Sequence, residues 1–345
     1  MPNHRILYTN NMLMQKAINN RTLTISESEK PLLFSHLTST QQLANTNFQD
    51  LLINADLLDV IDLIPNDIAD VIIIDPPYNL TKDFNGMIFS ARSDEAYEAY
   101  LRTWFHKVCK KLKPNGSVYL CGDWKCTSSL QRVMSEELTI LNRITWQREK
   151  GRGAKSNWKN AMEDVWFGVK NDKDYYFNVE AVKMKRKVIA PYKVDGKPKD
   201  WEETENGNFR ITYPSNFWDD ISIPFWSMPE NTDHPTQKPE KLFAKFILAS
   251  SKEGDMIFDP FMGSGTACVV AKKLGRHYLG VDINEEYCLW AAKRLHMAEK
   301  DTAIQGYEDG LFWERNSLAT QKQNIRKSNT YSQEHKSIEL ELFNN

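Results

Sequence analysis

The residues whose types and spacing best suit chemistry are Asp75-Pro76-Pro77-Tyr78, which directly follow the apolar run Val71–Ile74. Two consecutive prolines fix the backbone and remove two amide donors, so the Asp75 carboxylate and the Pro76 carbonyl remain as acceptors in a rigid arrangement. This pair fits an exocyclic NH₂ group, which offers two donors, and the Tyr78 ring can stack on a base. A simple turn is the alternative for Asp-Pro-Pro alone. Four residues in this order at the end of a strand favour a site for an amino group.

A second candidate site is the loop Phe258–Thr266, which joins a predicted strand to a predicted helix. The loop glycines, Gly263 and Gly265, let a ligand approach the backbone and its amides. Asp282 ends the next predicted strand, where a carboxylate can accept hydrogen bonds from ribose hydroxyls. A lone Gly-x-Gly is usually structural, but this order of elements predicts a pocket for a nucleoside cofactor. Neither G-x-G-x-x-G nor a P-loop sequence is present, which disfavours a dinucleotide or a nucleoside triphosphate.

Alternating strands and helices must position these residues. The predicted strands are Leu51–Ile53, Val71–Ile74, Ser117–Leu120, Met256–Phe258 and His277–Val281, and the predicted helices are 93–112, 241–250, 266–274 and 285–297. Residues 51–74 read as a β–α–β unit, and the unbroken run Val71–Ile74 is typical of a parallel strand covered on both faces. The alternation predicts an α/β fold with both sites at the carboxyl ends of strands.

Composition divides the chain into five parts. A polar arm (1–48) precedes a first α/β half (49–142), an inserted region without α/β rhythm (143–229), a second α/β half (230–316) and a polar tail (317–345). The arm can equally be a leader without function. Residues 79–93, with a turn at Asn85-Gly86, form either a mobile lid over the first site or a surface loop.

The net charge of the whole chain and the distribution of charge along it lead to different conclusions about nucleic-acid binding. The net charge of −2 and the pI near 6.4 argue against a uniformly basic nucleic-acid coat. Residues 141–200, however, carry 15 Lys and Arg against 8 acids, a net of +7, so the rest of the chain carries −9. The clusters at 148–159 and 183–187 suit phosphate contacts, although solvated surface charge is the alternative for any single lysine.

Other classes of protein are disfavoured by composition. The apolar runs are far shorter than the roughly 20 residues that span a bilayer, and the N-terminus lacks an apolar signal region, so we expect a cytoplasmic protein without a membrane partner. The five cysteines form no C-x-x-C pair, which predicts free, buried thiols. The seven histidines do not group with acids at metal-ligand spacing, so no metal site is expected.

Together these motifs resemble the permuted β class of S-adenosylmethionine-dependent DNA amino-methyltransferases, in which Asp-Pro-Pro-Tyr precedes Phe-x-Gly-x-Gly. The resemblance covers residues 50–300 and implies a Rossmann-like sheet with helices on both faces and an inserted target-recognition region. An initial Asp in the catalytic motif is associated with adenine N6 more often than with cytosine N4. The implied partner is double-stranded DNA, and the resemblance also brings in a cognate restriction endonuclease and a homodimer.

The resemblance assigns roles residue by residue. The implied catalytic residues are Asp75, Pro76, Pro77 and Tyr78. The implied S-adenosylmethionine contacts are Asp56, Asp75, His234, Thr236, Lys238, Phe261, Gly263, Ser264, Gly265, Thr266, Asp282 and Ile283, with Lys238 as a charge partner for the methionine carboxylate. The DNA-binding candidates are Arg148, Lys150, Arg152, Lys155, Lys159, Lys183, Lys185, Arg186 and Lys187. The alternative for His234 and Lys238 is a loop that only positions the next helix.

The implied reaction is direct in-line displacement by the amine of a base that has been flipped out of the duplex. A cytosine-N4 enzyme on the same scaffold is the nearest alternative. An RNA methyltransferase and a non-catalytic DNA-binding regulator are more distant ones, and the intact Asp75–Tyr78 motif argues against the regulator.

Overall fold

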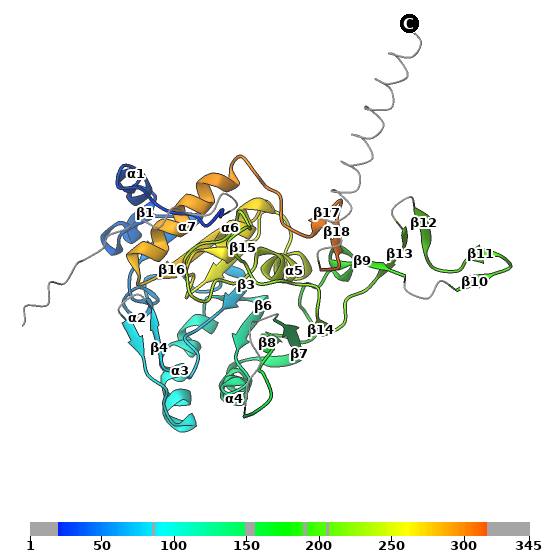
Figure 1. The fold of residues 1–345 in the computed structure, drawn as a ribbon. Helices are drawn as coiled ribbons and strands as arrows, with labels where there is room; N and C mark the ends of the chain where they lie inside the picture. The colour runs from blue at the N-terminus through cyan, green and yellow to red at the C-terminus, as the bar shows by residue number, and fades with distance from the viewer. Residues whose placement is uncertain (1–19, 85–86, 149–155, 189–191, 205–206, 316–345) are drawn as a thin grey trace, which may run out of the picture.

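Apolar strands from both halves of the chain pair into one nine-stranded sheet (Figure 1). The computed structural model describes residues 20–84, 87–148, 156–188, 192–204 and 207–315. The strands follow the spatial order β1 (Leu37–Thr38), β2 (Leu51–Asn54), β16 (His277–Asp282), β15 (Met256–Asp259), β3 (Ala69–Ile74), β6 (Leu112–Gly122), β8 (Met162–Val169), β7 (Thr139–Gln147) and β14 (Phe217–Trp218). Within this sheet β8 runs antiparallel to its neighbours β6 and β7, and the other paired strands are parallel.

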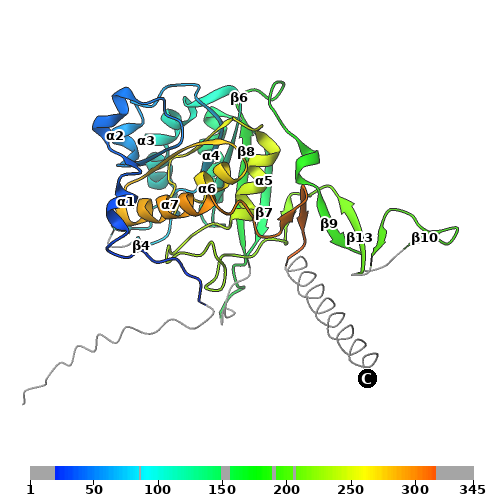
Figure 2. The same cartoon turned by 90° about the horizontal axis from the view of Figure 1, so that it is seen from above.

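Helices cover both faces of the sheet, as the α/β prediction requires (Figure 2). One face packs against α2 (Leu57–Val60), α3 (Asp94–Cys109) and α4 (Thr127–Glu137), and the other packs against α5 (Glu240–Ser250), α6 (Thr266–Lys273) and α7 (Glu285–Ala298). Within the described ranges, no helix has the length and apolar character needed to cross a membrane.

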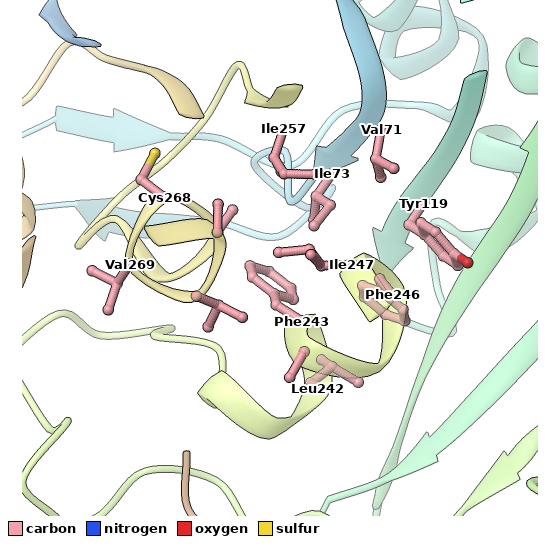
Figure 3. Close-up of a cluster of buried hydrophobic side chains, with 14 of the residues drawn as sticks. Val71, Ile73, Tyr119, Leu242, Phe243, Phe246, Ile247, Ile257, Cys268 and Val269 are labelled. Atoms are coloured by element: carbon pink, nitrogen blue, oxygen red, sulfur yellow. The ribbon is translucent and has the colours of Figure 1, made fainter. Parts of the chain in front are cut away.

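The alternating side chains of β3 explain how one strand serves two cores. Val71 and Ile73 belong to the cluster with α5 and α6, whereas Ile72 and Ile74 belong to the cluster with α3. Figure 3 shows Ile73 facing Phe243 of α5, with Val71 farther along the same strand. Successive residues of a strand point to opposite faces, so a strand buried on both sides reads as an unbroken apolar run. All four residues are fully buried, which confirms the predicted environment of this strand.

Local sequence signals set the ends of the long helices. Ser93 caps α3 by accepting a hydrogen bond from the amide of Ala96, and Asn284 caps α7 by accepting one from Tyr287. Acids occupy the first turn of both helices, where they complement the helix dipole. The predicted helices and strands of the two α/β halves are therefore confirmed, with shifts of a few residues at their ends.

Strand order differs from the local β–α–β interpretation of residues 51–74. β2 and β3 are parallel but not adjacent, because β16 and β15 lie between them. The C-terminal half therefore completes the middle of a sheet whose flanking strands come from the N-terminal half. Local periodicity specifies which segments are strands, whereas their partners are set by long-range pairing.

The expected insert, residues 143–229, is also divided differently by the structure. Its first part contributes most of β7 and all of β8 to the central sheet, and β14 returns to that sheet at the far edge. From the remainder, β9 (Met184–Lys187), β12 (Glu202–Thr204) and β13 (Gly207–Thr212) form a second sheet with β17 (Tyr307–Glu308) and β18 (Leu311–Trp313), which follow α7. The spatial order of this sheet is β12, β13, β9, β18 and β17. The short ribbon of β10 (Lys193–Val194) and β11 (Lys197–Pro198) extends outward beyond it (Figure 1).

The described part of the N-terminal arm packs on the core. It forms α1 (Lys30–Phe34), β1 and the 3₁₀ helix η1 (Thr40–Asn45), and Lys293 of α7 forms an ion pair with Glu29 at 2.6 Å. A second 3₁₀ helix, η2 (Val179–Val182), precedes β9. The candidate lid contains the antiparallel strands β4 (Lys82–Phe84) and β5 (Met87–Phe89), and its expected turn at residues 85–86 lies outside the described residues, as do residues 1–19 and 316–345.

Candidate active site

The two predicted sites open into one cavity at the carboxyl edge of the sheet. Asp75 follows the last residue of β3, the glycine loop follows β15, and Asp282 is the last residue of β16. These three strands are adjacent and parallel, so their carboxyl ends meet. The cavity they line has a volume of about 500 Å³, within the usual range for a small-molecule site.

The Asp75 carboxylate is held from two directions. The ammonium of Lys238 lies 2.7 Å from Oδ1 and 2.6 Å from Oδ2, and the Tyr78 hydroxyl donates to Oδ1 at 2.9 Å. Behind the motif, the Tyr97 hydroxyl donates to the Pro77 carbonyl at 3.0 Å. The predicted rigid turn is therefore anchored to α3 and oriented by two side-chain donors.

A second carboxylate, Glu163 of β8, completes this cluster. It is only 3% exposed, and its Oε2 lies 3.3 Å from the Tyr78 hydroxyl, whose single proton is shared between Asp75 and Glu163 with the shorter contact to Asp75. The Lys238 ammonium lies 3.5 Å from its Oε2, and Arg148 forms an ion pair with its Oε1. Sequence reasoning missed Glu163 because residues 143–229 were read as an insert. The available signal was an acid at the start of the apolar run Val165–Val169.

Burial and neighbouring charge set the protonation of the cluster. Burial raises the pKa of the Asp75 carboxyl, and the Lys238 ammonium opposes that rise. Burial alone would lower the pKa of Lys238, but the carboxylates of Asp75 and Glu163 outweigh it and raise that pKa. Burial and the same two carboxylates raise the pKa of Tyr78 well above its usual value, so its hydroxyl remains a donor. The site thus holds charges that are paired and hydrogen-bonded.

The glycine loop has the close packing that its sequence predicts. Gly263 and Gly265 have φ angles of 51° and 77°, in the left-handed region. A Cβ on Gly265 would lie 2.5 Å from the Cβ of Ala291, and one on Gly263 would lie 2.8 Å from Nε2 of His234. Side chains at either position would therefore displace neighbouring atoms, so the turn needs glycine at both.

Asp282 joins this loop to β16. Its Oδ2 accepts from the Gly263 amide and its Oδ1 from the Asn284 amide, each at 2.8 Å. Burial raises the pKa of Asp282 to about 6. A carboxylate has about four acceptor positions, so each oxygen retains capacity for a further donor. The cavity size, the exposed loop backbone and this acid together fit a nucleoside with two ribose hydroxyls.

The other predicted cofactor residues also line the cavity, and several have structural roles. Cavity-lining positions include Asp56, Thr236, Phe261, Ser264, Thr266 and Ile283. Asp56 caps α2 by accepting from the Leu58 amide at 2.8 Å. Buried Arg294 donates to the Ser264 carbonyl at 2.9 Å and to Thr266 Oγ1 at 3.0 Å, bracing the loop from behind. Some of the predicted cofactor residues therefore also stabilise the loop and the start of α2.

His234 is a neutral packing residue in this structure. Its Nδ1 accepts from the Thr236 amide at 3.3 Å, and its ring lies edge-on to Tyr287 at 4.3 Å. Burial, reinforced by nearby Lys238, lowers the pKa of His234 to about 3. Lys238 was predicted as a charge partner for the methionine carboxylate of the cofactor. In the structure its ammonium pairs with Asp75, and the contact with the cofactor stays a prediction.

The predicted DNA-binding residues separate into two places. Arg148 lines the catalytic cavity through its ion pair with Glu163, and exposed Lys159 lies in the same β7–β8 connection. Lys185, Arg186 and Lys187 belong to β9 of the second sheet. Lys183 precedes β9 and forms an ion pair with Glu180 at 2.5 Å. Lys150, Arg152 and Lys155 lie outside the described residues.

The five cysteines are free and buried, as expected. Burial raises the pKa of Cys121 and of Cys268 well above the usual thiol value. Neither thiol is therefore suited to act as a nucleophile. Among the described residues, no group of three or more His, Cys, Asp or Glu side chains could hold a metal ion.

The sheet is mostly parallel, and its carboxyl edge brings a glycine loop, a terminal acid and an Asp-Pro-Pro-Tyr turn into one cavity. This combination defines a Rossmann-like methyltransferase acting on amino groups. The chain belongs to the DNA methylase family (N6_N4_Mtase), whose sequence model matches residues 69–294.

Individual relatives agree with this membership. The type II methyltransferase M.HpaI of Haemophilus parainfluenzae is 32% identical over 241 residues, which cover 69% of this chain and 70% of the relative. The DNA adenine methyltransferase YhdJ of Escherichia coli K12 is 32% identical over 253 residues, covering 73% and 84%. The solved PvuII DNA methyltransferase, which is cytosine-N4-specific, superimposes with a TM-score of 0.53 at 17% identity over 73% of this chain and 92% of that one. This last likeness concerns the fold alone.

Proposed function

We propose that the chain is a site-specific DNA methyltransferase that uses S-adenosylmethionine to methylate the N6 amine of adenine. The observation that carries the proposal is the single cavity that joins Asp75 and Tyr78 to the Gly263 loop and Asp282. The adenine methyltransferase named among its relatives and the Asp at the start of the catalytic motif support adenine over cytosine. The family includes both N6 and N4 types, so cytosine N4 is the second candidate.

Under this proposal each group has a task. S-adenosylmethionine supplies a methyl group on a positively charged sulfur, open to in-line attack. The Asp75 carboxylate and the Pro76 carbonyl accept hydrogen bonds from the two N–H groups of the base amine. These hydrogen bonds favour a tetrahedral nitrogen in the transition state. Tyr78 provides a flat surface that replaces part of the stacking lost when the base leaves the duplex. Asp75, whose pKa is raised by burial, is placed to receive the proton that the nitrogen loses.

Product analysis tests the base assignment. Duplex DNA methylated by the protein, digested to nucleosides and analysed by mass spectrometry, is expected to contain N6-methyladenine. Only N4-methylcytosine would overturn the adenine assignment, and transfer to RNA but not to duplex DNA would overturn the substrate. Single-molecule sequencing of DNA from cells expressing the protein would identify the recognition sequence in the same material.

We place the main DNA-contacting surface on the second sheet and its ribbon. Lysines recur along β9, β10 and β11, and several are exposed, including Lys187, Lys193 and Lys197. Aromatic side chains lie among them: Tyr192 and Tyr213 are exposed, and the Lys193 ammonium lies 5.6 Å from the Trp201 ring. Basic residues interleaved with aromatics suit a phosphate backbone and its bases.

The salt dependence of DNA binding tests this surface. The double variant Lys187→Ala/Lys193→Ala is expected to weaken binding to all DNA sequences and to reduce the slope of log affinity against log salt by about 2, since each phosphate contact contributes about 0.9. Fluorescence anisotropy over a salt series measures both. Lys30→Ala on distant α1 is the matched control (Figure 1). If the slope of log affinity against log salt is unchanged in the double variant, Lys187 and Lys193 do not contact DNA phosphates.

Two partner predictions extend the proposal. A restriction endonuclease that cleaves the same sequence is the expected functional partner, supported by the relative named as a type II methyltransferase. The homodimer suggested by the family resemblance is testable by light scattering of the full chain.

A further inference from the structure

The catalytic cluster contains one buried charged group that the proposed transfer does not itself use. Glu163 lies in the cavity wall beside Asp75, yet its partners are protein side chains: Arg148, Tyr78 and Lys238. Tyr78 and Lys238 are also the two side chains that hold Asp75. Tyr78 and Lys238 therefore each contact both carboxylates, that of Glu163 and that of Asp75.

We propose that Glu163 is a positioning residue for methyl transfer. Arg148 holds Glu163, and Glu163 in turn keeps the Tyr78 hydroxyl and the Lys238 ammonium in place on Asp75. One carboxylate oxygen of Asp75 then faces the target amine. The inference rests on the proposed methyltransferase function. It also gives Arg148 a role inside the catalytic cavity in place of the phosphate contact predicted from its sequence context.

The hydrogen-bond count indicates which oxygen of Asp75 is available. Oδ1 accepts from both Tyr78 and Lys238, which occupies its two lone pairs. Oδ2 accepts from Lys238 at 2.6 Å and retains acceptor capacity for one further donor. The target N–H is therefore directed to Oδ2. If either donor rotated away, Oδ1 would also become available and the amine could bind in more than one orientation.

Glu163 contacts the same two donors, Tyr78 and Lys238. The Tyr78 hydroxyl lies between the two carboxylates, 2.9 Å from Asp75 and 3.3 Å from Glu163, and the buried Lys238 ammonium lies between them as well, at 2.6 and 3.5 Å. Arg148 in turn fixes Glu163, so its carboxylate cannot turn toward the solvent without breaking an ion pair. Misplacement of a reacting group by about 1 Å can cost about a hundredfold in rate.

The charge of Glu163 gives the proposal a measurable signature. Its negative charge raises the pKa of Asp75, secondary to burial and against the opposing effect of Lys238. Replacing Glu163 by the neutral, isosteric glutamine should lower the pKa of Asp75, so activity that needs the Asp75 carboxylate should persist to lower pH. The other titratable groups around Asp75 are Tyr78, Tyr97 of α3, Cys121 of β6 and Asp259 of β15, and all of them remain in the variant.

The experiment compares Glu163→Gln with wild type in single-turnover methylation of duplex DNA across pH 4.5 to 8. We expect the maximal rate to fall about 10- to 100-fold, S-adenosylmethionine affinity to stay within about twofold, and the acid limb of the rate profile to move to lower pH. Asp164→Asn is the matched control, since Asp164 is the next acid on β8 and hydrogen-bonds Thr145 instead of the catalytic cluster.

Glu163→Gln leaves Arg148 without its charge partner and could prevent folding, so two further variants test the same role. Glu163→Asp keeps the charge but withdraws the carboxylate, so the rate should fall while the acid limb stays at the wild-type pH. In a Tyr78→Phe background, the effect of changing Glu163 should shrink because one of the two shared donors is gone. A loss that only follows thermal stability, or an unchanged rate, would overturn the positioning role. Failure of the wild-type protein to methylate DNA would instead overturn the proposed function.

Discussion

Asp75→Ala is expected to abolish methyl transfer while S-adenosylmethionine binding survives. Loss of a preorganised hydrogen-bonding group in an active site costs about 100- to 1000-fold in rate, and Asp75 is the acceptor placed for the base amine. The hydrogen bonds of Asp75 in the structure run to Lys238 and Tyr78, whereas the glycine loop is held by Asp282 and Arg294. The cofactor half of the cavity therefore does not depend on Asp75.

Transfer of labelled methyl groups to DNA and calorimetric titration with S-adenosylmethionine measure the two properties separately. Because alanine leaves the buried Lys238 ammonium with only the more distant Glu163, Asp75→Asn is the companion variant that preserves volume. It keeps one carbonyl acceptor but loses the charge, so a residual rate above that of alanine is expected. Loss of both transfer and binding in the well-folded asparagine variant would show that Asp75 belongs to the cofactor site.

Asp220→Ala is expected to destabilise the protein by about 3 to 5 kcal/mol, the usual cost of removing one partner from a buried ion pair. Asp220 is buried between two buried lysines of α5, with Lys241 at 2.7 Å and Lys245 at 2.8 Å. Lys245 also contacts the sulfur of Met184 on β9, and Lys241 donates to the Trp313 carbonyl of β18. The triad thus joins the second sheet to the catalytic domain, and its loss should weaken DNA binding as well.

The stability contribution of Asp220 should depend on pH. Burial would raise its pKa, but the ammonium groups of Lys245 and Lys241 outweigh burial and lower it to about 2. A carboxyl whose pKa is lower in the folded state stabilises that state above its unfolded pKa of about 3.9 and loses this effect as pH falls toward the folded value. Urea unfolding at pH 7 and below pH 3 measures the difference. The stability gap between wild type and Asp220→Asn should narrow at low pH, whereas Asp172→Asn, at an exposed site, should match wild type throughout. A gap that is absent at pH 7 would contradict the role of the triad.

Residues near one another in the sequence carried most of what could be predicted. The unbroken run Val71–Ile74, the cap at Ser93 and the turn at Gly263 depend on local sterics and local hydrogen bonds, so they are readable without the fold. Because parallel strands place their carboxyl ends at one edge, the position of Asp75 and Asp282 near a common cavity also followed from the order of elements.

The β7–β8 hairpin shows where such reasoning stopped. Most of its residues were assigned to an insert because residues 143–229 contain scattered Trp, Tyr, Asn and Lys and no clear alternation of strands and helices. In the structure, β8 pairs with β6 from Asp164 to Val169. Membership of the central sheet is decided by which edge is available when the chain folds, and no local pattern records that. Glu163 consequently received no role and Arg148 was predicted to contact DNA, whereas the structure places both in the cavity wall.

The amino-acid sequence by itself determined the α/β class and the two motifs, since each depends on short segments whose chemistry is local. The type of reaction followed from the resemblance of those motifs to a known family. Only the tertiary structure decided that β15 and β16 lie between β2 and β3, and that Lys238 and Glu163 surround Asp75. The contact of Lys238 with Asp75 joins residues 163 positions apart, and the pairing of β2 with β16 joins residues 228 positions apart. These contacts form only when the whole sheet edge is buried. The low dielectric of the buried edge strengthens the electrostatic interactions among Asp75, Lys238 and Glu163, which couples them into one cluster.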